Sequence, residues 1–361
     1  NNHYEVLGVS GADVHLENVF LREGVRVVNV PMQRVISPIK DLLTLWKLYL
    51  LFCHEKPKIV HSITPKAGLL SMTAAYFARV PIRIHTFTGL IFPTKTGIFQ
   101  KVLILMDKCL CFFATNIYPE GEGVKNDLVN YKITKKVLPI IANGNVNGID
   151  INYFDFKLFT NEQKSLLRSS LAINASDFIF IFVGRLVGDK GINELVAAFK
   201  KLQSTSSCTF QISLLLVGPL EPLLDPLNPI TLREINNNKK IISVGFKSDI
   251  RPYLSISDIF TFPSYREGFP NVVLQAGAMG LPCIVTDVNG CNEIIEEGNN
   301  GWIIPVRDED AIFNSMRNCI LKINKTTVHK SNIRNIIKNK YDQRIVWKSI
   351  LTEYKCLEKN L

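Results

Sequence analysis

Short β-branched runs alternate with helix-length segments through the first half of the chain. The runs read YEVLGVS (4–10), VRVVNV (25–30), KIVHSIT (58–64) and IRIHTFT (82–88). Each run precedes or follows a segment that is long enough to form a helix. This alternation is typical of a parallel sheet whose strands are connected by crossover helices.

The second half repeats this pattern with strands that are apolar throughout. The runs are FIFIFVG (178–184), QISLLLVG (211–218), IISVGF (241–246), DIFTFPS (258–264) and PCIVT (282–286). The clearest helix between them is GINELVAAFKKLQ (191–203). Strands this uniformly apolar are buried on both faces, as in a doubly wound sheet.

A segment rich in asparagine and glycine, residues 137–155, separates the two patterns and has the chemistry of turns. We therefore expect an α/β protein with a first domain over 1–145 and a second over 146–340. The remainder, 341–361, is expected to form a helix that crosses back to the first domain. Two doubly wound domains joined by a hinge make the cleft between them the expected site.

The composition is that of an ordinary globular protein, with 361 residues of which 47% are hydrophobic. Eight cysteines show no CxxC pair, and several stand in apolar surroundings, where cysteine behaves as a small hydrophobe. We therefore expect a reducing, cytosolic compartment and no metal site. No apolar run is long enough to span a bilayer.

Positive charge is concentrated in the first half of the chain. Residues 22–136 hold 17 lysines and arginines against seven acids, a surplus equal to the +10 of the whole chain. Such a surplus can attract a phosphorylated substrate, an anionic membrane surface or nucleic acid. Nucleic acid is the least favoured partner, because no aromatic motif is interleaved with the basic residues.

The segment 37–53, SPIKDLLTLWKLYLLFC, combines leucines, Trp46 and Tyr49 with Lys40 and Lys47. This composition suits a helix that lies in a membrane interface. It equally suits a helix packed on a sheet, and the sequence leaves both alternatives open.

Two cations follow the apolar run at 178–184. Arg185 and Lys190 stand in GRLVGDKGI (184–192), where a ligand of an open α/β sheet is bound. Cations and free backbone amides at that place favour an anion. His85, in IRIHTFTGL, is expected at the end of a strand of the first domain, facing the cleft.

The stretch YREGFPNVVLQAGAMG (265–280) follows the run at 258–264 in the same way. Glu267 lies in the turn, and a helix is expected from Asn271. Because a helix N-terminus offers spare N–H donors and partial positive charge, it can bind a diphosphate or sugar oxygens. Gln275 lies eight residues after Glu267, a little over two helical turns, so both can line one side of the cleft.

Three stretches together resemble the retaining glycosyltransferases of family 4, which have the GT-B fold of two Rossmann-like doubly wound domains facing a cleft. They are FVGRLVGDKGI (182–192), SVGFKSDI (243–250) and FPSYREGFPNVVLQAGAMGLPCIVTDVNGCNEII (262–295). Within that family the chain is similar to bacterial enzymes that build capsular or other glycans on undecaprenyl diphosphate, including N-acetylgalactosaminyltransferases.

The resemblance implies a role for each matching residue. Arg185 and Lys190 match the cations that hold the diphosphate of a nucleotide sugar, and Gly184 precedes them. Glu267 matches an acid that contacts sugar hydroxyls, and His85 matches a histidine beside the reacting sugar. The remaining donor-site residues implied are Val244 and Phe246 for the base, and Gly268, Phe269, Asn271 and Gln275 for sugar, phosphate and ribose.

The chain departs from the family pattern in two places. The family has a second acid where this chain has Gln275, and an amide should bind the ribose hydroxyls roughly half as strongly as a carboxylate. Family members also begin with a strand and a glycine-bearing loop, and none precedes YEVLGVSG. We expect that a first strand is missing from the sequence.

The resemblance implies a retaining, metal-independent transfer of a hexose or N-acetylhexosamine from a UDP-sugar, with no cofactor. The expected acceptor is a polyprenyl-diphosphate-linked saccharide, and the expected location is peripheral, on the anionic inner face of the cytoplasmic membrane. Two alternatives remain open: an isomerase like the UDP-sugar 2-epimerases, and a catalytically silent nucleotide-sugar-binding protein.

Overall fold

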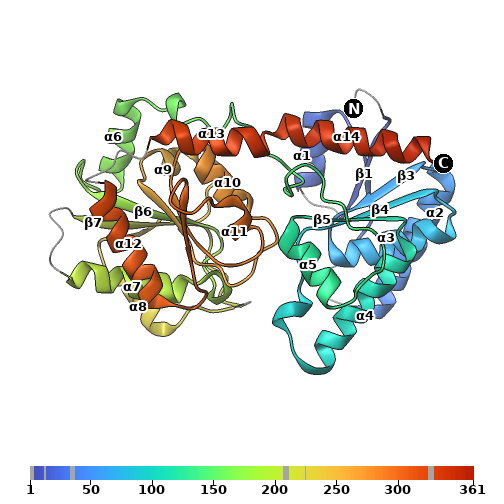
Figure 1. Ribbon diagram of the computed structural model, residues 1–361, viewed down its shortest axis with the longest axis horizontal. Coiled ribbons are helices and arrows are strands. Elements are labelled where there is room, and N and C mark those ends of the chain that lie inside the picture. The colour runs from blue at the N-terminus through green and yellow to red at the C-terminus, as the bar shows by residue number, and fades with distance from the viewer. Residues whose placement is uncertain (1–3, 12–13, 33–36, 206–210, 224, 324–328) are drawn as a thin grey trace. The chain divides into compact units, whose positions relative to one another are not determined.

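The computed structural model describes residues 4–11, 14–32, 37–205, 211–223, 225–323 and 329–361. The chain forms two compact units (Figure 1). Unit 1 comprises residues 1–119, 124–139 and 353–361, and unit 2 comprises residues 120–123 and 140–352. The chain therefore leaves unit 1 within the segment rich in asparagine and glycine, and its last residues return to unit 1.

Unit 2 is built on a six-stranded, wholly parallel sheet with the strand order β11-β10-β9-β6-β7-β8. The strands are β6 (Phe178–Val183), β7 (Ile212–Val217), β8 (Ile241–Ser243), β9 (Ile259–Phe262), β10 (Cys283–Thr286) and β11 (Gly301–Ile304). The helices are α6 (Asn161–Ser170), α7 (Ile192–Ser204), α8 (Pro229–Asn237), α9 (Arg251–Ser255), α10 (Asn271–Ala278), α11 (Cys291–Ile294), α12 (Glu309–Ile323) and α13 (Lys330–Tyr341). Short 3-10 helices occupy η2 (Phe156–Leu158) and η3 (Gly188–Lys190).

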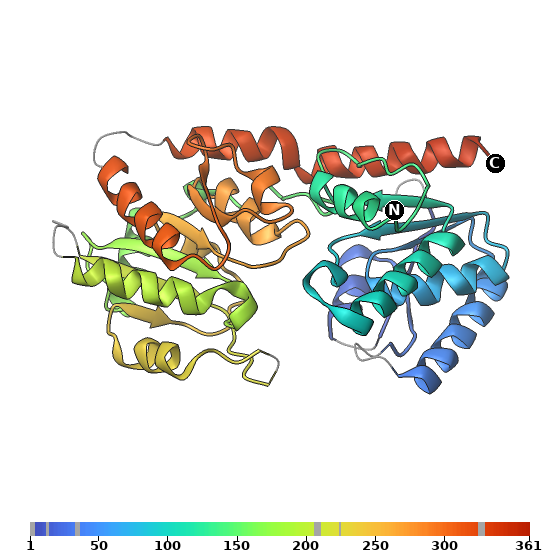
Figure 2. The ribbon, with the colours of Figure 1, turned by 60° about the horizontal axis from the view of Figure 1, so that its bottom comes forward.

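Helices cover both faces of this sheet (Figures 1 and 2). Helix α7 packs against α8 and α12, whereas α10 packs against α13 and α6 against α9. Strands β6, β7, β9 and β10 are buried along almost their whole length, which explains their continuous apolar sequences. The five strands predicted in the second half are confirmed.

Unit 1 contains parallel strands in two groups, β1-β2 and β3-β4-β5. The strands are β1 (Leu7–Ser10), β2 (Arg26–Asn29), β3 (Ile59–Ser62), β4 (Ile82–Phe87) and β5 (Asn116–Pro119). The helices are α1 (Val14–Glu23), α2 (Pro38–Glu55), α3 (Pro65–Phe77), η1 (Phe92–Thr94) and α4 (Gly97–Phe113). Helices α5 (Glu122–Asn130) and α14 (Gln343–Lys359) each contribute residues to both units.

The sequence patterns missed two strands, β5 and β11. Each has only four residues, NIYP and GWII, and neither run is long enough to show a periodicity. The seven described cysteines form no disulfide with one another, and five of them are buried or half-buried, whereas Cys53 and Cys356 are exposed. Cys208 lies outside the described residues.

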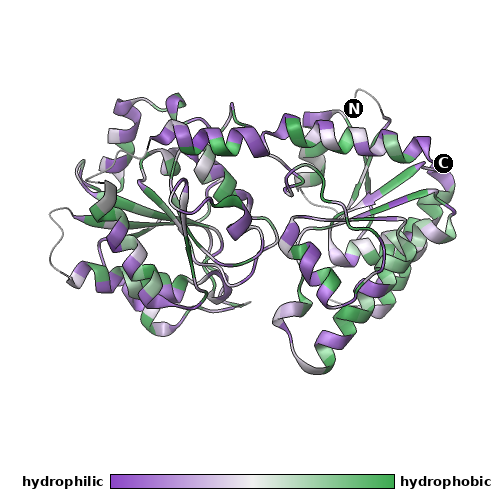
Figure 3. Cartoon of the chain, in the orientation of Figure 1, coloured by the Kyte–Doolittle hydropathy of each residue, from purple (hydrophilic) through white to green (hydrophobic). Residues whose placement is uncertain are grey.

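Helices α2, α3 and α4 pack side by side in unit 1 and leave many large apolar side chains exposed. Hydrophobic residues run along α4 and occur on α2 (Figure 3). Helix α2 buries Thr44, Leu48 and Phe52 against the rest of unit 1, yet its other side is also apolar. Among the helices that the structure describes, none combines the length and the apolar character needed to cross a membrane.

Candidate active site

The order of strands in unit 2 defines where a ligand is expected to bind. The chain runs outward from β6 through β7 to β8, then returns to β9 on the other side of β6 and continues to β11. The switch point therefore lies between β6 and β9, and ligands of open α/β sheets bind beyond the carboxyl ends of strands at such a point. Arg185 and Lys190 follow β6, and Glu267 follows β9.

Lys190 and Glu267 form an ion pair at this switch point, with Lys190 Nζ donating to Glu267 Oε1. Their side chains are only 15% and 14% exposed. Lys190 Nζ also lies 5.5 Å from the centre of the Phe262 ring at the end of β9. Because burying a lone charge is costly, each of these two groups supplies the counter-charge that the other needs.

Gly191 allows the loop after β6 to approach β9 closely. Its φ is +69°, and a Cβ atom at this position would lie 2.1 Å from the carbonyl oxygen of Pro263. The Tyr265 backbone N–H donates to the Asp189 carbonyl at 2.9 Å, which joins the two loops directly. The ion pair of Lys190 with Glu267 therefore rests on a fixed backbone contact between the two strand ends.

Arg185 forms an ion pair with Glu221, which follows β7. Its Nη1 donates to Glu221 Oε2 at 2.9 Å, and its side chain is 44% exposed. Gly184, which precedes it, donates its N–H to the Val217 carbonyl and so keeps the end of β6 paired with β7. The two cations follow the same strand, but the structure pairs each of them with a separate carboxylate.

A set of polar contacts behind the ion pair was not predicted from the sequence. The Tyr265 hydroxyl donates to Glu194 Oε1 at 2.5 Å, and the Arg307 guanidinium lies 4.7 Å from the centre of the Tyr265 ring. Burial and Glu194 together raise the pKa of Tyr265. The Asp189 N–H donates to Asp225 Oδ2 at 2.5 Å. These contacts join residues far apart in sequence, so no local pattern could have revealed them.

Helix α10 begins at Asn271, directly after the turn that carries Glu267. The Asn271 side chain accepts a hydrogen bond from Asn145 at 2.9 Å. Gln275 lies one turn further along, half-buried, and its amide has no hydrogen-bond partner among the described residues. Phe269 is buried against Tyr341, with 5.5 Å between the ring centres, and Gly268 is also buried. At these two positions only the backbone is therefore available to bind a ligand.

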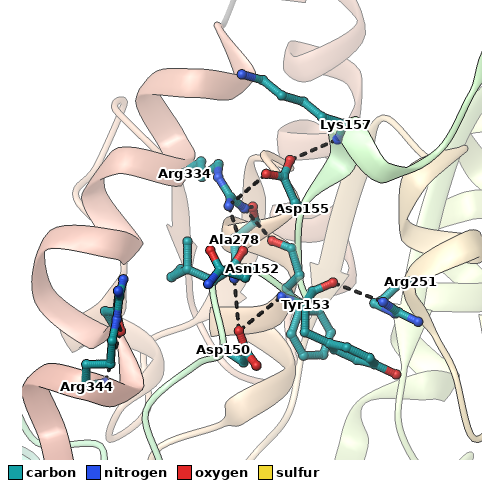
Figure 4. Close-up of polar contacts among 12 residues, drawn as sticks. Asp150, Asn152, Tyr153, Asp155, Lys157, Arg251, Ala278, Arg334 and Arg344 are labelled. Carbon is teal, nitrogen blue, oxygen red and sulfur yellow. Dashed lines mark hydrogen bonds and ion pairs between the residues drawn. The ribbon is translucent and has the colours of Figure 1, made fainter.

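Arg334 of α13 secures the other end of α10. It donates to the Ala278 carbonyl at 2.7 Å and to the Ile151 carbonyl at 2.6 Å, and it also contacts the Asp155 carboxylate (Figure 4). One guanidinium thus joins the C-terminus of α10 to the segment that follows residue 148. The helix that carries Asn271 and Gln275 is fixed at both ends.

The end of β8 presents the two residues expected to read a base. The Val244 N–H donates to the Leu216 carbonyl at 3.0 Å, and the Gly218 N–H donates to the Gly245 carbonyl at 2.9 Å. Phe246 is 72% exposed. An exposed aromatic ring beyond a strand end is able to stack on a planar ligand.

His85 does not lie where the sequence predicted. Strand β4 continues to Phe87, so the prediction that His85 ends the strand is wrong. The ring is fully buried, accepts or donates one hydrogen bond with Ser62 at 2.8 Å, and leaves no room for a Cβ atom on Gly68. Burial and, to a smaller extent, His61 lower the pKa of His85 to about 3. The Nε2 atom of His85 is buried and has no hydrogen-bond partner within the described part of the chain. The catalytic role that the resemblance implies for His85 stays a prediction.

Comparisons with known proteins identify the family of this chain. The family described as "Glycosyl transferases group 1" matches residues 177–322. The capsular polysaccharide biosynthesis glycosyltransferase CapM of Staphylococcus aureus is 33% identical over 326 residues, which cover 90% of this chain and 83% of CapM. The UDP-Gal:alpha-D-GlcNAc-diphosphoundecaprenol alpha-1,3-galactosyltransferase of Escherichia coli is 30% identical over 299 residues, which cover 82% of this chain and 75% of that enzyme.

Solved structures extend the agreement to the fold. The crystal structure of Anabaena Alr3699/HepE in complex with UDP-glucose matches with a TM-score of 0.78 at 21% identity, covering 97% of this chain and 91% of that one. The two parallel α/β units are the two Rossmann-like domains of the GT-B fold. The chain belongs to the group 1 glycosyltransferases.

Proposed function

We propose that this glycosyltransferase moves a hexose or N-acetylhexosamine from a UDP-sugar to a polyprenyl-diphosphate-linked saccharide in bacterial surface-glycan synthesis. The observation that carries the proposal is the half-buried Lys190–Glu267 pair at the switch point of unit 2. The Escherichia coli relative supports the donor and acceptor classes, since its name specifies UDP-Gal and a diphosphoundecaprenol acceptor. The Anabaena neighbour, solved with UDP-glucose, supports the same donor class.

Donor binding would exchange the partners of the ion pair. In the proposed complex Lys190 turns from Glu267 to the diphosphate, and Glu267 accepts hydrogen bonds from sugar hydroxyls instead. Arg185 would exchange Glu221 for the same diphosphate. The backbone N–H groups of Gly268 and Phe269 and the start of α10 add donors near the phosphates.

The base and ribose are assigned to the residues beside this centre. We assign the uracil to the end of β8, where Val244 offers its backbone and Phe246 an exposed ring. Gln275 would accept from the ribose hydroxyls through its carbonyl oxygen. This amide is unpaired within the described part of the chain, so no internal bond has to break first.

The proposed reaction retains the anomeric configuration. The bond from the anomeric carbon to the diphosphate oxygen breaks, and its electron pair stays on the leaving UDP. The acceptor hydroxyl attacks the same face, forms the new glycosidic bond and passes its proton to the leaving phosphate. Lys190 and Arg185 stabilise the developing charge, and each charge-assisted hydrogen bond contributes roughly 1.5–3 kcal/mol. The proposal assigns this stabilisation to the two side chains rather than to a metal ion.

We further propose that the face formed by α2 and α4 lies against the anionic surface of the cytoplasmic membrane, where the lipid-linked acceptor is held. The exposed apolar residues of this α2–α4 face are Ile39, Leu42, Leu43, Trp46, Leu50, Ile98, Phe99, Val102, Leu105 and Phe112. Four exposed lysines share these helices: Lys40, Lys47, Lys101 and Lys108. Apolar side chains interspersed with lysines match an interface of acyl chains and anionic headgroups.

The test is transfer of radiolabelled sugar from a panel of UDP-, GDP- and dTDP-sugars into lipid extracts of bacterial membranes, with the full chain as enzyme. Label from a UDP-sugar in the polyprenyl-linked fraction is the expected result. Label only from GDP- or dTDP-sugars would overturn the donor assignment. Binding of UDP-sugar without transfer to any lipid-linked saccharide would instead favour a silent binding protein, and epimerised UDP-sugar without an acceptor would favour an isomerase.

A further inference from the structure

Asn145 is a fully buried amide in the segment that enters unit 2, and its orientation is fixed by backbone. The N–H groups of Asn147 and Gly148 both donate to Asn145 Oδ1, at 3.1 Å and 2.7 Å. Only the oxygen of the amide can accept two such bonds. The NH2 group of Asn145 must therefore point the other way.

That NH2 group donates to Oδ1 of Asn271 at 2.9 Å. The orientation of one amide thus determines the orientation of the next, because Asn145 Nδ2 can pair only with an acceptor. The NH2 group of Asn271 is in turn directed away from Asn145. Within the described part of the chain it has no partner and is not among the buried unpaired atoms, so it is open to solvent.

Close packing holds Asn145 in this position. Gly144, with a φ of +109°, has no space for a Cβ atom, which would lie 2.8 Å from Cε2 of Phe269. On the other side, the Val146 N–H donates to Glu120 Oε1 at 3.0 Å. The segment is therefore pressed against the turn that carries Glu267 and cannot shift to release Asn271.

We propose that Asn145 is a positioning residue for the donor site, which sets the Asn271 amide so that it presents N–H donors and not its oxygen. The inference rests on the proposed function, because the oxygens of a nucleotide sugar would be the acceptors. Phosphate oxygens can only accept, so a reversed Asn271 would face them with a repelling carbonyl oxygen. Asn145 itself need not touch the donor.

The variant that tests the proposal is Asn145→Asp. An aspartate has nearly the same shape and still accepts from both backbone N–H groups, but it cannot donate to Asn271. Asn271 then has to reverse and point its oxygen at the ligand. We expect UDP-sugar to bind about tenfold more weakly in calorimetric titration. The matched control is Asn147→Asp, the same change at an exposed side chain two residues away, which should bind as the wild type does.

A double-mutant cycle separates orientation from added charge. In an Asn271→Ala background, Asn145→Asp should change UDP-sugar affinity by less than twofold, since no amide remains to be reversed. Equal weakening in both backgrounds would assign the effect to the new charge and overturn the proposal, as would unchanged affinity in the wild-type background.

If Asn145→Asp does not fold, as judged by circular dichroism, Asn145→Ser takes its place. A serine hydroxyl is too short to hold both N–H groups and Asn271, so we expect about threefold weaker binding that again vanishes with Asn271→Ala. Failure of the wild-type chain to bind any UDP-sugar would overturn the proposed function and this inference together. Binding by the wild type with no effect of either Asn145 variant would overturn this inference alone.

Discussion

The two units place their apolar and charged side chains in opposite ways. Unit 2 buries the apolar residues of its sheet and gathers paired charges at the strand ends, with Lys190 against Glu267 and Arg185 against Glu221. Unit 1 leaves large apolar residues exposed along α2 and α4 and has exposed lysines beside them. The proposed site for a small charged donor therefore consists of charges held within one unit, whereas the proposed site for a lipid-linked acceptor is an exposed surface of the other.

The largest expected effect lies in the charged centre of unit 2. Glu267→Ala should lower kcat/KM by about a thousandfold, roughly 4 kcal/mol, because it removes a sugar contact and leaves Lys190 without its counter-charge. Steady-state transfer of labelled sugar gives the value, and Glu162→Ala, an exposed acid on α6, is the control. Lys190→Ala should lower kcat/KM by about the same factor. The double variant should lower it little further than either single variant. Retention of more than a tenth of the activity by Glu267→Ala would contradict the proposed mechanism.

The next largest effect is expected in the dependence of the free energy of unfolding on pH. Burial, with a smaller contribution from Glu293, raises the pKa of Glu120 in unit 2 to about 7, above its unfolded value of 4.5. The neutral form is favoured in the fold, so the free energy of unfolding should fall by roughly 2–3 kcal/mol as pH rises from about 4.5 to 8. Glu120→Gln should remove this loss in denaturant titrations at pH 5 and pH 8. If the free energy of unfolding fell equally with pH in the variant and the wild type, this prediction would be wrong.

Two histidines of unit 1, His61 and His85, respond to pH with the opposite sign to Glu120. Burial lowers the pKa of His61 to about 4 and that of His85 to about 3, below the unfolded value of 6.5. The fold therefore favours the neutral form of both histidines. The stability that this preference contributes is lost as pH falls from about 6.5 through the two lowered pKa values. Hydrogen exchange should show that the backbone amides of β3 and β4 lose protection as pH falls. The amides near Glu120 should instead lose protection as pH rises. Loss of amide protection in acid that is confined to unit 2 would contradict this prediction.

A smaller effect is expected for the residues of unit 1 that we propose to face the membrane. Trp46→Ser combined with Leu42→Ser should weaken binding to phosphatidylglycerol vesicles by about tenfold, because both exposed side chains would otherwise enter the interface. Affinity for UDP-sugar should not change. Leu166→Ser, at an exposed leucine of α6 in unit 2, is the matched control. Sedimentation that shows a stable dimer, with no vesicle binding, would assign the α2–α4 face to a second copy of the chain instead.

The smallest effect is expected at Gln275. Gln275→Glu restores a charged acceptor for the ribose hydroxyls, and a charge-assisted hydrogen bond is roughly twice as strong as a neutral one. KM for the UDP-sugar should fall about threefold with kcat unchanged, as measured in initial-rate assays. The control is Gln211→Glu, at an exposed residue before β7. A rise in KM would show that Gln275 does not face the ribose.

The sequence predicts the framework of this protein better than its site. Runs such as FIFIFV and ISLLLV identify β6 and β7 because burial on both faces removes every polar residue from them. The four-residue strands β5 and β11 carry no such signal. Within the site, the partner of Lys190 lies 77 residues away, and Arg185 is paired with Glu221 rather than held beside Lys190. Such pairings depend on strand order, which local patterns do not contain.

His85 and Asn145 are two further residues whose surroundings the sequence pattern does not predict. The strand pattern predicts His85 at the end of its strand, whereas β4 continues to Phe87 and the ring packs against Gly68, 17 positions earlier on α3. The role inferred for Asn145 has no counterpart in the sequence pattern, where this residue is one of several turn-forming asparagines. Its burial and the directions of its hydrogen bonds distinguish it from its neighbours.

The pair of Lys190 and Glu267 bears on turnover as well as on binding. In the proposed mechanism, an intact nucleotide sugar satisfies both charges, since the lysine meets phosphate while the carboxylate meets sugar. Once the sugar has been passed on, UDP alone leaves Glu267 without a partner, and the lysine is drawn back to it. In that mechanism the ion pair of Lys190 with Glu267 would compete with UDP for the lysine, and this competition would favour release of the product before the next cycle.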